Sequence, residues 1–340
     1  MKEILTIHAA GCVLCHDLTR IVPGVMKDAQ FKKGHVVTEA DIPMLLSMGK
    51  EHLFVWEADE NTLHENDAAA RLAALCEGPH MARGPVKEGK IELFAGIDGL
   101  LTVDVERLDA VNEIDELMIA TRHTNTPVKT GDKLCGTRVI PLVIDKSRLE
   151  AAERVCGNAP LLSIRPYTVR TAAIIATGSE VKNGLIEDKF TPVVEQKLAA
   201  FGVSTVFHAM PGDEADEIVR AIGRARESGA ELILCTGGMS VDPDDRTPGA
   251  IKQSGADIVT YGAPVLPGAM FLIGYYGDGT PVLGLPGCVM YARASIFDLM
   301  LPRVLAGVRV KRSDLTKLGN GGLCLGCEIC TFPNCGFGKE

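Results

Sequence analysis

The pattern of apolar residues predicts an α/β domain in the second half of the chain. There, short continuous apolar runs alternate with segments whose apolar residues recur at helical spacing. A continuous run is typical of a strand buried on both faces, and helical spacing is typical of a helix that covers one face of a sheet. Strands are expected at 172–177 and 231–236, and helices around 190–201 and 218–225. This order predicts a three-layer α/β/α domain with a mostly parallel sheet at residues 169–308.

The end of this domain is predicted to be a hairpin followed by one helix. The apolar runs 270–276 and 281–285 are joined by Gly-Asp-Gly at 277–279, which is a hairpin signal. Residues 288–305 are expected to form the final helix. Pro302 is expected to interrupt it, because proline lacks the backbone N–H that a helix uses.

The first half of the chain has a different pattern, which predicts a β-rich α+β region. A helix is expected at 39–48 after an N-cap at Thr38, followed by a strand at 53–56. Alternating apolar residues punctuated by glycines continue to Ile144, and Pro160 and Pro166 are interpreted as a linker. The predicted parts are an N-terminal region at 1–85, a small β-rich domain at 86–165, the α/β domain at 169–308 and a short cysteine-rich tail at 320–340.

Composition excludes some partners and compartments. The net charge of -9 argues against nucleic acid, since binding a phosphate backbone needs a concentrated basic surface. No apolar run reaches the ~18 residues of a membrane span, and the first residues lack the apolar core of a signal peptide. We therefore expect a cytoplasmic protein without a membrane partner. In that compartment, the 11 cysteines are expected to be reduced thiols or metal ligands.

Three glycine-bearing turns follow predicted strands of the α/β domain. In an open α/β sheet, ligands bind outside the carboxyl ends of the strands, and glycine lets the backbone approach an anion closely. For the first turn, at 177–180, a plain turn is an equal alternative. The candidate binding residues of the three turns are Thr177, Gly178, Ser179, Thr236, Gly237, Gly238, Ser240, Pro286 and Gly287.

The second and third turns carry further signals of anion binding. The second continues into Asp242, Asp244 and Asp245, and carboxylates beside a phosphate are expected where a divalent cation bridges the two. A solvated acidic loop is the alternative. Thr247 is expected to be the N-cap of the next helix. The third turn directly precedes the final predicted helix, whose positive dipole end favours a phosphate, although an ordinary strand-to-helix turn has the same pattern.

The order of these motifs resembles a known domain. The motifs are Thr-Gly-Ser-Glu-Val from 177, Thr-Gly-Gly-Met-Ser-Val from 236, Val-Leu-Pro-Gly from 265 and Leu-Pro-Gly from 285. Together they resemble the pterin-binding domain shared by molybdopterin molybdenumtransferases, molybdopterin adenylyltransferases and competence-damage-inducible proteins. The resemblance covers roughly residues 170–308. Residues 33–49 resemble a segment of the molybdenumtransferase branch.

The resemblance implies a ligand, a metal and a reaction. In the molybdenumtransferases, the glycine turns hold the pterin phosphate, acidic residues hold magnesium, and molybdate is delivered to an adenylylated molybdopterin. Carried over by motif, Glu180 and Asp245 become candidate catalytic residues, and Pro267 and Gly268 join the cofactor-binding set. The resemblance also implies a homodimer. The candidate magnesium ligands are Asp242, Asp244 and Asp245.

One departure from the family leaves the function open. The molybdenumtransferases place lysines around the Pro-Gly segment, where they would attract molybdate, whereas this chain has Leu266 and Ala269. The leading hypothesis is a magnesium-dependent molybdopterin-binding transferase that takes part in molybdate insertion. The second is a non-catalytic carrier or sensor that serves a molybdenum hydroxylase as its client. The third is a nucleotide pyrophosphatase of the competence-damage type.

The cysteine spacing of the tail predicts a metal site. Four thiols fall within twelve residues in the pattern Cys-x2-Cys-x2-Cys-x4-Cys, which suits one structural zinc ion or one iron–sulfur cluster. A disordered, reduced tail is the alternative. A shorter pattern, Cys12-x2-Cys15-His16, is left unassigned. The predicted tail ligands are Cys324, Cys327, Cys330 and Cys335.

Overall fold

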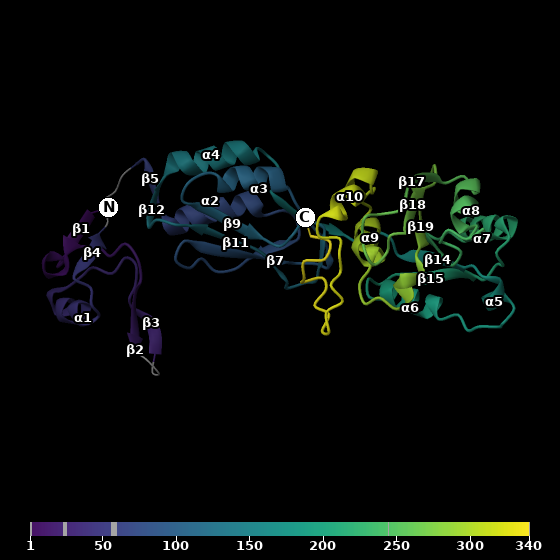
Figure 1. Ribbon diagram of the computed structural model, residues 1–340. Helices are drawn as coiled ribbons and strands as arrows, with labels where there is room; N and C mark the ends of the chain where they lie inside the picture. The colour runs from purple at the N-terminus through teal and green to yellow at the C-terminus, as the bar shows by residue number, and fades with distance from the viewer. Residues whose placement is uncertain (1, 23–25, 56–59, 244, 340) are drawn as a thin grey trace. The chain divides into compact units, whose positions relative to one another are not determined.

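The computed structural model describes residues 2–22, 26–55, 60–243 and 245–339 (Figure 1). Two compact units divide the chain. The first comprises Met1–Gly96, Val103–Arg122 and Gly131–Ser163, and the second comprises Ile97–Thr102, His123–Thr130 and Ile164–Glu340. The four segments predicted from the sequence remain a proposal about the organisation of the chain.

The first unit begins with two strand pairs and a short helix. The expected helix is a 3-10 turn, Glu39–Asp41, that continues into α1. The Asp41 carboxylate accepts hydrogen bonds from the backbone N (2.8 Å) and Oγ1 (2.7 Å) of Thr38 and contacts His35, and these bonds lower the pKa of Asp41 to about 2. The expected strand at 53–56 is β4, although Trp56 lies outside the described residues. The elements are β1 (Lys2–Leu5) paired with β4 (His52–Val55), β2 (Leu18–Val22) paired with β3 (Met26–Phe31), and α1 (Ile42–Ser47).

The rest of the first unit is an antiparallel sheet with helices gathered on one side (Figure 1). Helix α2 packs on β7 and β11, while α3 packs on β9 and α4. The sheet has the order β6-β7-β11-β9. Its strands are β6 (Met81–Arg83), β7 (Lys90–Ala95), β11 (Lys133–Val139) and β9 (Leu117–Thr121). The remaining elements are α2 (Glu65–Cys76), α3 (Val105–Asn112), α4 (Lys146–Cys156) and the pair β5 (Thr62–His64) and β12 (Val143–Asp145).

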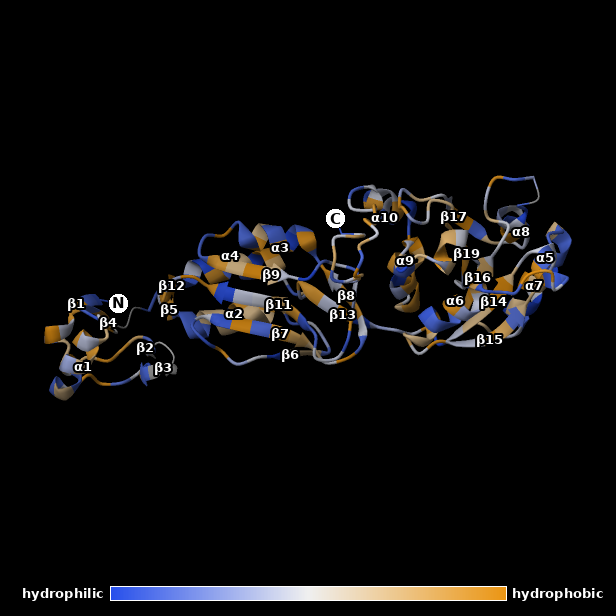
Figure 2. Cartoon of the chain, turned by 60° about the horizontal axis from the view of Figure 1, so that its bottom comes forward, coloured by the Kyte–Doolittle hydropathy of each residue, from blue (hydrophilic) through white to orange (hydrophobic). Residues whose placement is uncertain are grey.

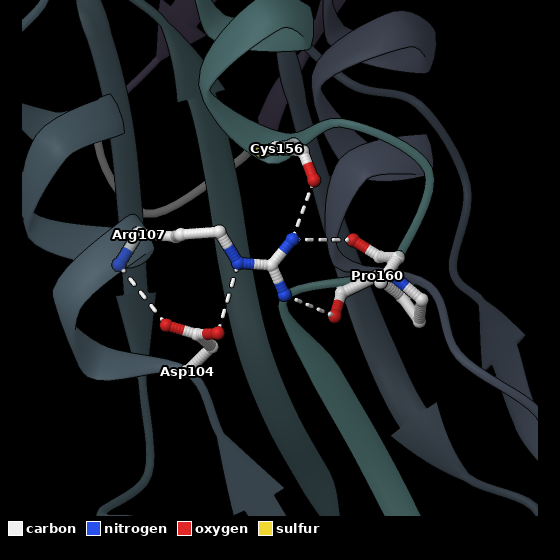
Figure 3. A network of polar contacts seen from close by, with 5 residues as sticks. Asp104, Arg107, Cys156 and Pro160 are labelled. Atoms are coloured by element: carbon white, nitrogen blue, oxygen red, sulfur yellow. Dashed lines mark hydrogen bonds and ion pairs between the residues drawn. The ribbon is translucent and has the colours of Figure 1, made fainter.

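Arg107 ties α3 to the segment that follows α4 (Figure 3). Its guanidinium donates to the backbone carbonyls of Cys156, Ala159 (2.9 Å) and Pro160 (3.3 Å), and to the Asp104 carboxylate (2.8 Å). Residues 162–166 then form a strand, so the linker predicted between the two prolines was wrong. A linker is solvated, whereas this segment is held by Arg107 and by pairing with β8.

The second unit contains a six-stranded sheet of order β15-β14-β16-β19-β18-β17. The first four strands are mutually parallel, and β18 and β17 are antiparallel additions, so the sheet is mostly parallel, as predicted. The strands β18 and β19 form the predicted hairpin. The bounds are β14 (Thr171–Ala176), β15 (Ser204–Ala209), β16 (Leu232–Thr236), β17 (Asp257–Tyr261), β18 (Leu272–Tyr275) and β19 (Pro281–Leu285).

Helices cover both faces of this sheet, which confirms the three-layer fold class. Ile174 and Leu234 point into a core with α6 and α9, whereas Ile175 and Ile233 point into a core with α7 and α8. Figure 1 places α7 and α8 across the sheet from α9, and Figure 2 colours the covering helices with both polar and apolar residues. The helices are α5 (Ser179–Lys182), α6 (Phe190–Ala199), α7 (Ala215–Glu227), α8 (Thr247–Gln253), α9 (Ile296–Leu305) and α10 (Arg312–Thr316). A small sheet of order β10 (Thr126–Val128), β8 (Gly99–Val103) and β13 (Leu162–Pro166) completes the list.

The final long helix differs from its prediction in two respects, its first residue and the effect of Pro302. Residues 287–290 form a 3-10 turn, and α9 begins only at Ile296. The Asp298 carboxylate accepts hydrogen bonds from the backbone N (2.8 Å) and Oγ (3.0 Å) of Ser295, which fixes this later start. Pro302 lies inside the helix without ending it, because nearly every residue of α9 is buried and packing offsets one lost hydrogen bond.

None of the helices in the described ranges combines the length and the apolar composition that crossing a membrane would need.

Replacing Arg107 with Met tests whether its hydrogen bonds hold the α3–α4 region. The change removes every donor while keeping an apolar stem, and we expect a loss of roughly 1–3 kcal/mol of local stability. Amide hydrogen exchange of α3 and of residues 157–161 should accelerate. Arg154→Met, at an exposed position on α4, is the matched control. Equal exchange in both variants would show that the guanidinium contributes nothing.

Candidate functional site

The three predicted glycine turns leave adjacent strands at the same edge of the six-stranded sheet. Strands β14, β16 and β19 are parallel neighbours, with Ala176 opposite Thr236 and Thr236 opposite Leu285. The turns that follow these three residues therefore lie side by side. The structure brings together the segments 177–180, 236–240 and 286–288, which are far apart in the sequence.

The Pro267-Gly268 segment lies at the same edge. It belongs to the loop before β18, and Leu272 at the start of β18 pairs with Gly284 near the end of β19. The Pro267 carbonyl accepts a hydrogen bond from the N of Ile296 (3.2 Å). A Cβ on Gly268 would lie 2.3 Å from Cγ2 of Ile296, at a φ of +128°. Only glycine fits where this segment touches the start of α9.

The first two turns are locked together by close packing. The Thr177 N donates to the Thr236 carbonyl (2.8 Å), and a Cβ on Gly237 would lie only 2.2 Å from the Thr177 carbonyl oxygen. The Thr177 hydroxyl is 3.1 Å from that of Thr247 and also donates to the Thr236 carbonyl. Thr177 and Thr236 are buried, so these contacts hold the two turns in place.

The role predicted for Thr247 was wrong. The N-cap of α8 is Arg246, and Thr247 is the first residue of the helix. Its side chain is fully buried against Thr177, and its N donates to the Gly238 carbonyl (3.2 Å). The Thr247 hydroxyl therefore contacts Thr177 in the neighbouring turn and is not available to cap α8.

The first turn leads into the short helix α5, whose start is held by an aspartate that the sequence reasoning missed. The N of Ser179 donates to Oδ2 of Asp213 (2.9 Å), and the N of Gly178 donates to the Pro211 carbonyl (3.3 Å). Asp213 follows β15, the next parallel strand, so a fourth strand-end turn joins the edge. The Pro-Gly-Asp motif after β15 was a usable signal. Glu180 is exposed.

The acidic loop is organised by Asp245. Its Oδ2 accepts from the N of Asp242 (3.1 Å), and its own N donates to the Asp242 carbonyl (2.9 Å). Tyr261 closes the loop from β17, donating to the carbonyls of Met239 (2.8 Å) and Ser240 (3.1 Å). Burial, and secondly the Asp245 carboxylate, raise the pKa of Tyr261. Sequence reasoning missed Tyr261, and Asp244 lies outside the described residues.

The third turn lacks the helix that was expected behind it. Pro286 is followed by the 3-10 turn at 287–290, so the dipole of a long helix does not act on this turn. Cys288 lies in this 3-10 turn, and its side chain is half-buried. Burial raises the pKa of its thiol above the usual value of a cysteine.

The predicted metal ligands lie in two places, the acidic loop and the cysteine-rich tail. In the tail, Cys324 and Cys335 are half-buried while Cys327 and Cys330 are exposed. Across the described ranges, no three His, Cys, Asp or Glu side chains are close enough to share one metal ion. Asp242, Asp245 and the four tail cysteines are among these side chains, so the magnesium and tail-metal assignments stay proposals.

The chain matches two family models. Residues 173–306 match a model described as "Probable molybdopterin binding domain", and residues 3–57 match a "Domain of unknown function (DUF8806)". The first match coincides with the six-stranded sheet and its edge of glycine turns. The second unit therefore carries the molybdopterin-binding domain that the sequence motifs indicated, which confirms the resemblance at the level of the shared domain.

Similarity to individual proteins is confined to part of the chain. A Geobacillus protein named "Putative competence-damage inducible protein" is 39% identical over 82 residues, which is 24% of this chain and 20% of that protein. A CinA-like protein of Thermomicrobium roseum is 37% identical over 89 residues, 26% of this chain and 22% of that protein. The chain thus spans about a fifth of the length of these curated relatives.

Solved structures of similar proteins include the molybdopterin biosynthesis enzyme MoaB of Thermus thermophilus. It is 23% identical, with a TM-score of 0.34, and the match covers 41% of this chain and 96% of that one. The protein CinA of Thermoplasma acidophilum is 18% identical, with a TM-score of 0.35, covering 40% of this chain and 98% of that one.

Gly237→Ala tests the close approach of the first two turns. The residue has a φ of +82°, so a side chain costs ~1–2 kcal/mol for the backbone conformation alone, and contact with the Thr177 carbonyl adds roughly 1–3 kcal/mol. Gly229→Ala, at a φ of +76° with nothing within 4 Å of the added Cβ, carries only the backbone cost. Urea unfolding should place Gly237→Ala clearly below Gly229→Ala, and equal midpoints would contradict the packing argument.

Cys288 should react slowly with iodoacetamide at neutral pH. Its raised thiol pKa leaves little thiolate there, so the rate should keep rising as the pH increases beyond the range of an ordinary thiol. Mass spectrometry of the peptide that carries Cys288 measures this rate, with a short unstructured cysteine peptide as the reference. Fast labelling of Cys288 at pH 7 would contradict the burial argument.

Proposed function

We propose that the second unit binds the phosphorylated pterin molybdopterin, or its adenylylated form, together with magnesium. The site is the sheet edge formed by the ends of β14, β16 and β19. The observation that carries the proposal is the side-by-side placement of the glycine turns after Ala176, Thr236 and Leu285. Glycine turns gathered at one sheet edge let the backbone approach a phosphate closely.

The residues of this edge take different roles in the proposal. The backbone at Gly178, Gly237 and Gly238 approaches the phosphate, because these positions carry no side chain in the way. Thr177 and Thr236 position that backbone through their buried contacts. The remaining proposed contacts to the cofactor come from Ser179, Ser240, Pro267, Gly268, Pro286 and Gly287.

The proposed reaction is delivery of molybdate to the dithiolene of adenylylated molybdopterin. Cleaving the phosphoanhydride of that substrate develops negative charge, which magnesium neutralises when carboxylates hold it in place. Asp245, with Asp242 and Asp244, is proposed to hold the metal, and Glu180 and Asp245 are the proposed catalytic carboxylates. In this scheme the chain acts as a transferase.

The absence of lysine at two positions favours a second candidate, a carrier or sensor of the finished cofactor. Leu266 and Ala269 flank the Pro-Gly segment, and Leu266 is 55% exposed at the position where a cation would meet molybdate. A carrier binds the cofactor without inserting the metal and passes it to a molybdenum hydroxylase. Complementation of a molybdenumtransferase-deficient strain separates the two: growth on the molybdoenzyme-dependent substrate supports the transferase, and tight cofactor binding without growth supports the carrier.

The sequence similarity to competence-damage relatives motivates a third candidate, a nucleotide pyrophosphatase. Hydrolysis of ADP-ribose by the purified chain, measured as release of AMP, supports it. Molybdopterin binding without any AMP release favours the first two candidates. The homodimer, the cytoplasmic location and the molybdoenzyme client stay predictions, and analytical ultracentrifugation tests the first of them.

Asp245→Asn tests the metal-dependent part of the site. The substitution keeps the size of the side chain but removes the charge that holds magnesium, so we expect molybdopterin affinity in the presence of magnesium to fall about tenfold, or ~1.4 kcal/mol. Quenching of pterin fluorescence under anaerobic conditions measures the affinity. Asp257→Asn is the matched control, because Asp257 is an exposed aspartate at the opposite end of β17.

Two outcomes would count against the proposal. The first is a wild-type chain that does not bind molybdopterin at micromolar concentration. The second is an equal affinity for Asp245→Asn and Asp257→Asn with and without magnesium, since the carboxylate would then hold no metal.

A further inference from the structure

The four tail cysteines line a single cavity. The cavity has a volume of about 690 Å³, and Cys324, Cys327, Cys330 and Cys335 all contribute to its wall, together with Arg293. All four are free thiols. The four cysteines that lie within twelve residues of the sequence therefore also line the same cavity in the structure. A disordered tail, the alternative, does not fit this arrangement.

The chain around the cavity is fixed to the α/β domain by hydrogen bonds and packing. The N of Leu266 donates to the Gly322 carbonyl (2.8 Å), and the N of Cys324 donates to the Leu266 carbonyl (2.7 Å). Arg293 donates to the Glu328 carbonyl (2.6 Å). Phe337, close to the end of the chain, is 4% exposed and belongs to the core that includes α9. The cavity therefore has a defined wall.

The spacing of the thiols favours a cluster over a single ion. Structural zinc sites usually draw their cysteines from two separate Cys-x2–4-Cys pairs, whereas the first three tail cysteines form one continuous Cys-x2-Cys-x2-Cys run, a spacing found in cluster-binding ferredoxin motifs. In a four-iron cluster each thiolate binds a different iron atom, so the sulfurs stand apart around a body of several atoms. Four thiols that line one cavity of about 690 Å³ leave room for a body of this kind.

The surroundings also suit an inorganic cluster. Phe332 and Phe337 provide an apolar wall on the side of the core, and Arg293 and Glu328, of opposite charge, also line the cavity. Cys327 and Cys330 are exposed, so iron and sulfide have a path of entry. Each thiol loses its proton when it binds iron.

We propose that Cys324, Cys327, Cys330 and Cys335 bind one [4Fe–4S] cluster in this cavity. The site is separate from the pterin edge and does not depend on the proposed function. It lies next to it, however, because Pro267 lines the cavity and its neighbour Leu266 is hydrogen bonded to Cys324. A cluster that fixes Cys324 also fixes the Pro-Gly segment of the proposed pterin site.

Metal analysis of the full-length chain, purified without oxygen and reconstituted with ferrous iron and sulfide, tests the site. We expect about four iron atoms and about four acid-labile sulfides per chain, a visible charge-transfer absorption that bleaches with dithionite, and an electron paramagnetic resonance signal after reduction. In the double variant Cys327→Ser/Cys330→Ser, iron and sulfide should fall at least tenfold. Because both side chains are exposed, this variant should keep the fold, as its circular dichroism spectrum will verify.

Cys12→Ser is the matched control, since Cys12 is a half-buried thiol of the other Cys-x2-Cys pair. Its iron and sulfide content should equal that of the wild type. One equivalent of zinc without sulfide would overturn the cluster assignment. So would iron that persists in the tail double variant, iron lost in Cys12→Ser, or a reconstituted wild type without metal.

Hydrogen exchange supplies a readout that does not use the metal itself. Removing the cluster with a chelator and an oxidant should accelerate exchange of the Cys324 and Leu266 amides, while the amides of β14 and β16 keep their protection. Unchanged exchange at Cys324 after removal would contradict a cluster bound through this residue.

Discussion

The close approach of the β16 turn to the end of β14 is the contact on which the candidate site depends. A Cβ at Gly237 would lie 2.2 Å from the Thr177 carbonyl oxygen, and the Thr177 hydroxyl reaches both the Thr236 carbonyl and Thr247. The conformation of each of these two turns therefore constrains the conformation of the other. Because β14, β16 and β19 are parallel neighbours, fixing the first two turns also fixes where the third turn stands relative to them.

Several polar side chains at this edge are hydrogen bonded to backbone groups. The Asp245 carboxylate accepts from the N of Asp242, Asp213 accepts from the N of Ser179, and Tyr261 donates to the Met239 carbonyl. These contacts hold the main-chain segments of the edge in place. The conformation of the edge is therefore set by side chains from several strand ends.

The tail and the α/β domain share the Pro-Gly segment. Leu266 exchanges hydrogen bonds with Gly322 and Cys324, while the next residue, Pro267, accepts from Ile296 at the start of α9. The segment is thereby held from two sides, by the cysteine-rich chain and by the domain core. Pro267 and the four tail cysteines line one cavity, so thiols lie beside the Pro-Gly segment.

The sequence by itself determined the alternation of buried strands and covering helices, the hairpin of β18 and β19, and the motifs of the molybdopterin-binding domain, because these depend on local periodicity and on turn chemistry. The start of α9 also had a local signal, Ser295 followed by Asp298, that was passed over in favour of the Leu-Pro-Gly turn. Only the tertiary structure decided that 162–166 is a strand, that Thr247 faces Thr177, and that Asp213 and Tyr261 reach the candidate site. Each of these depends on pairing or hydrogen bonding between segments far apart in the chain, and a side chain's partner across a sheet leaves no periodic trace in the sequence around it.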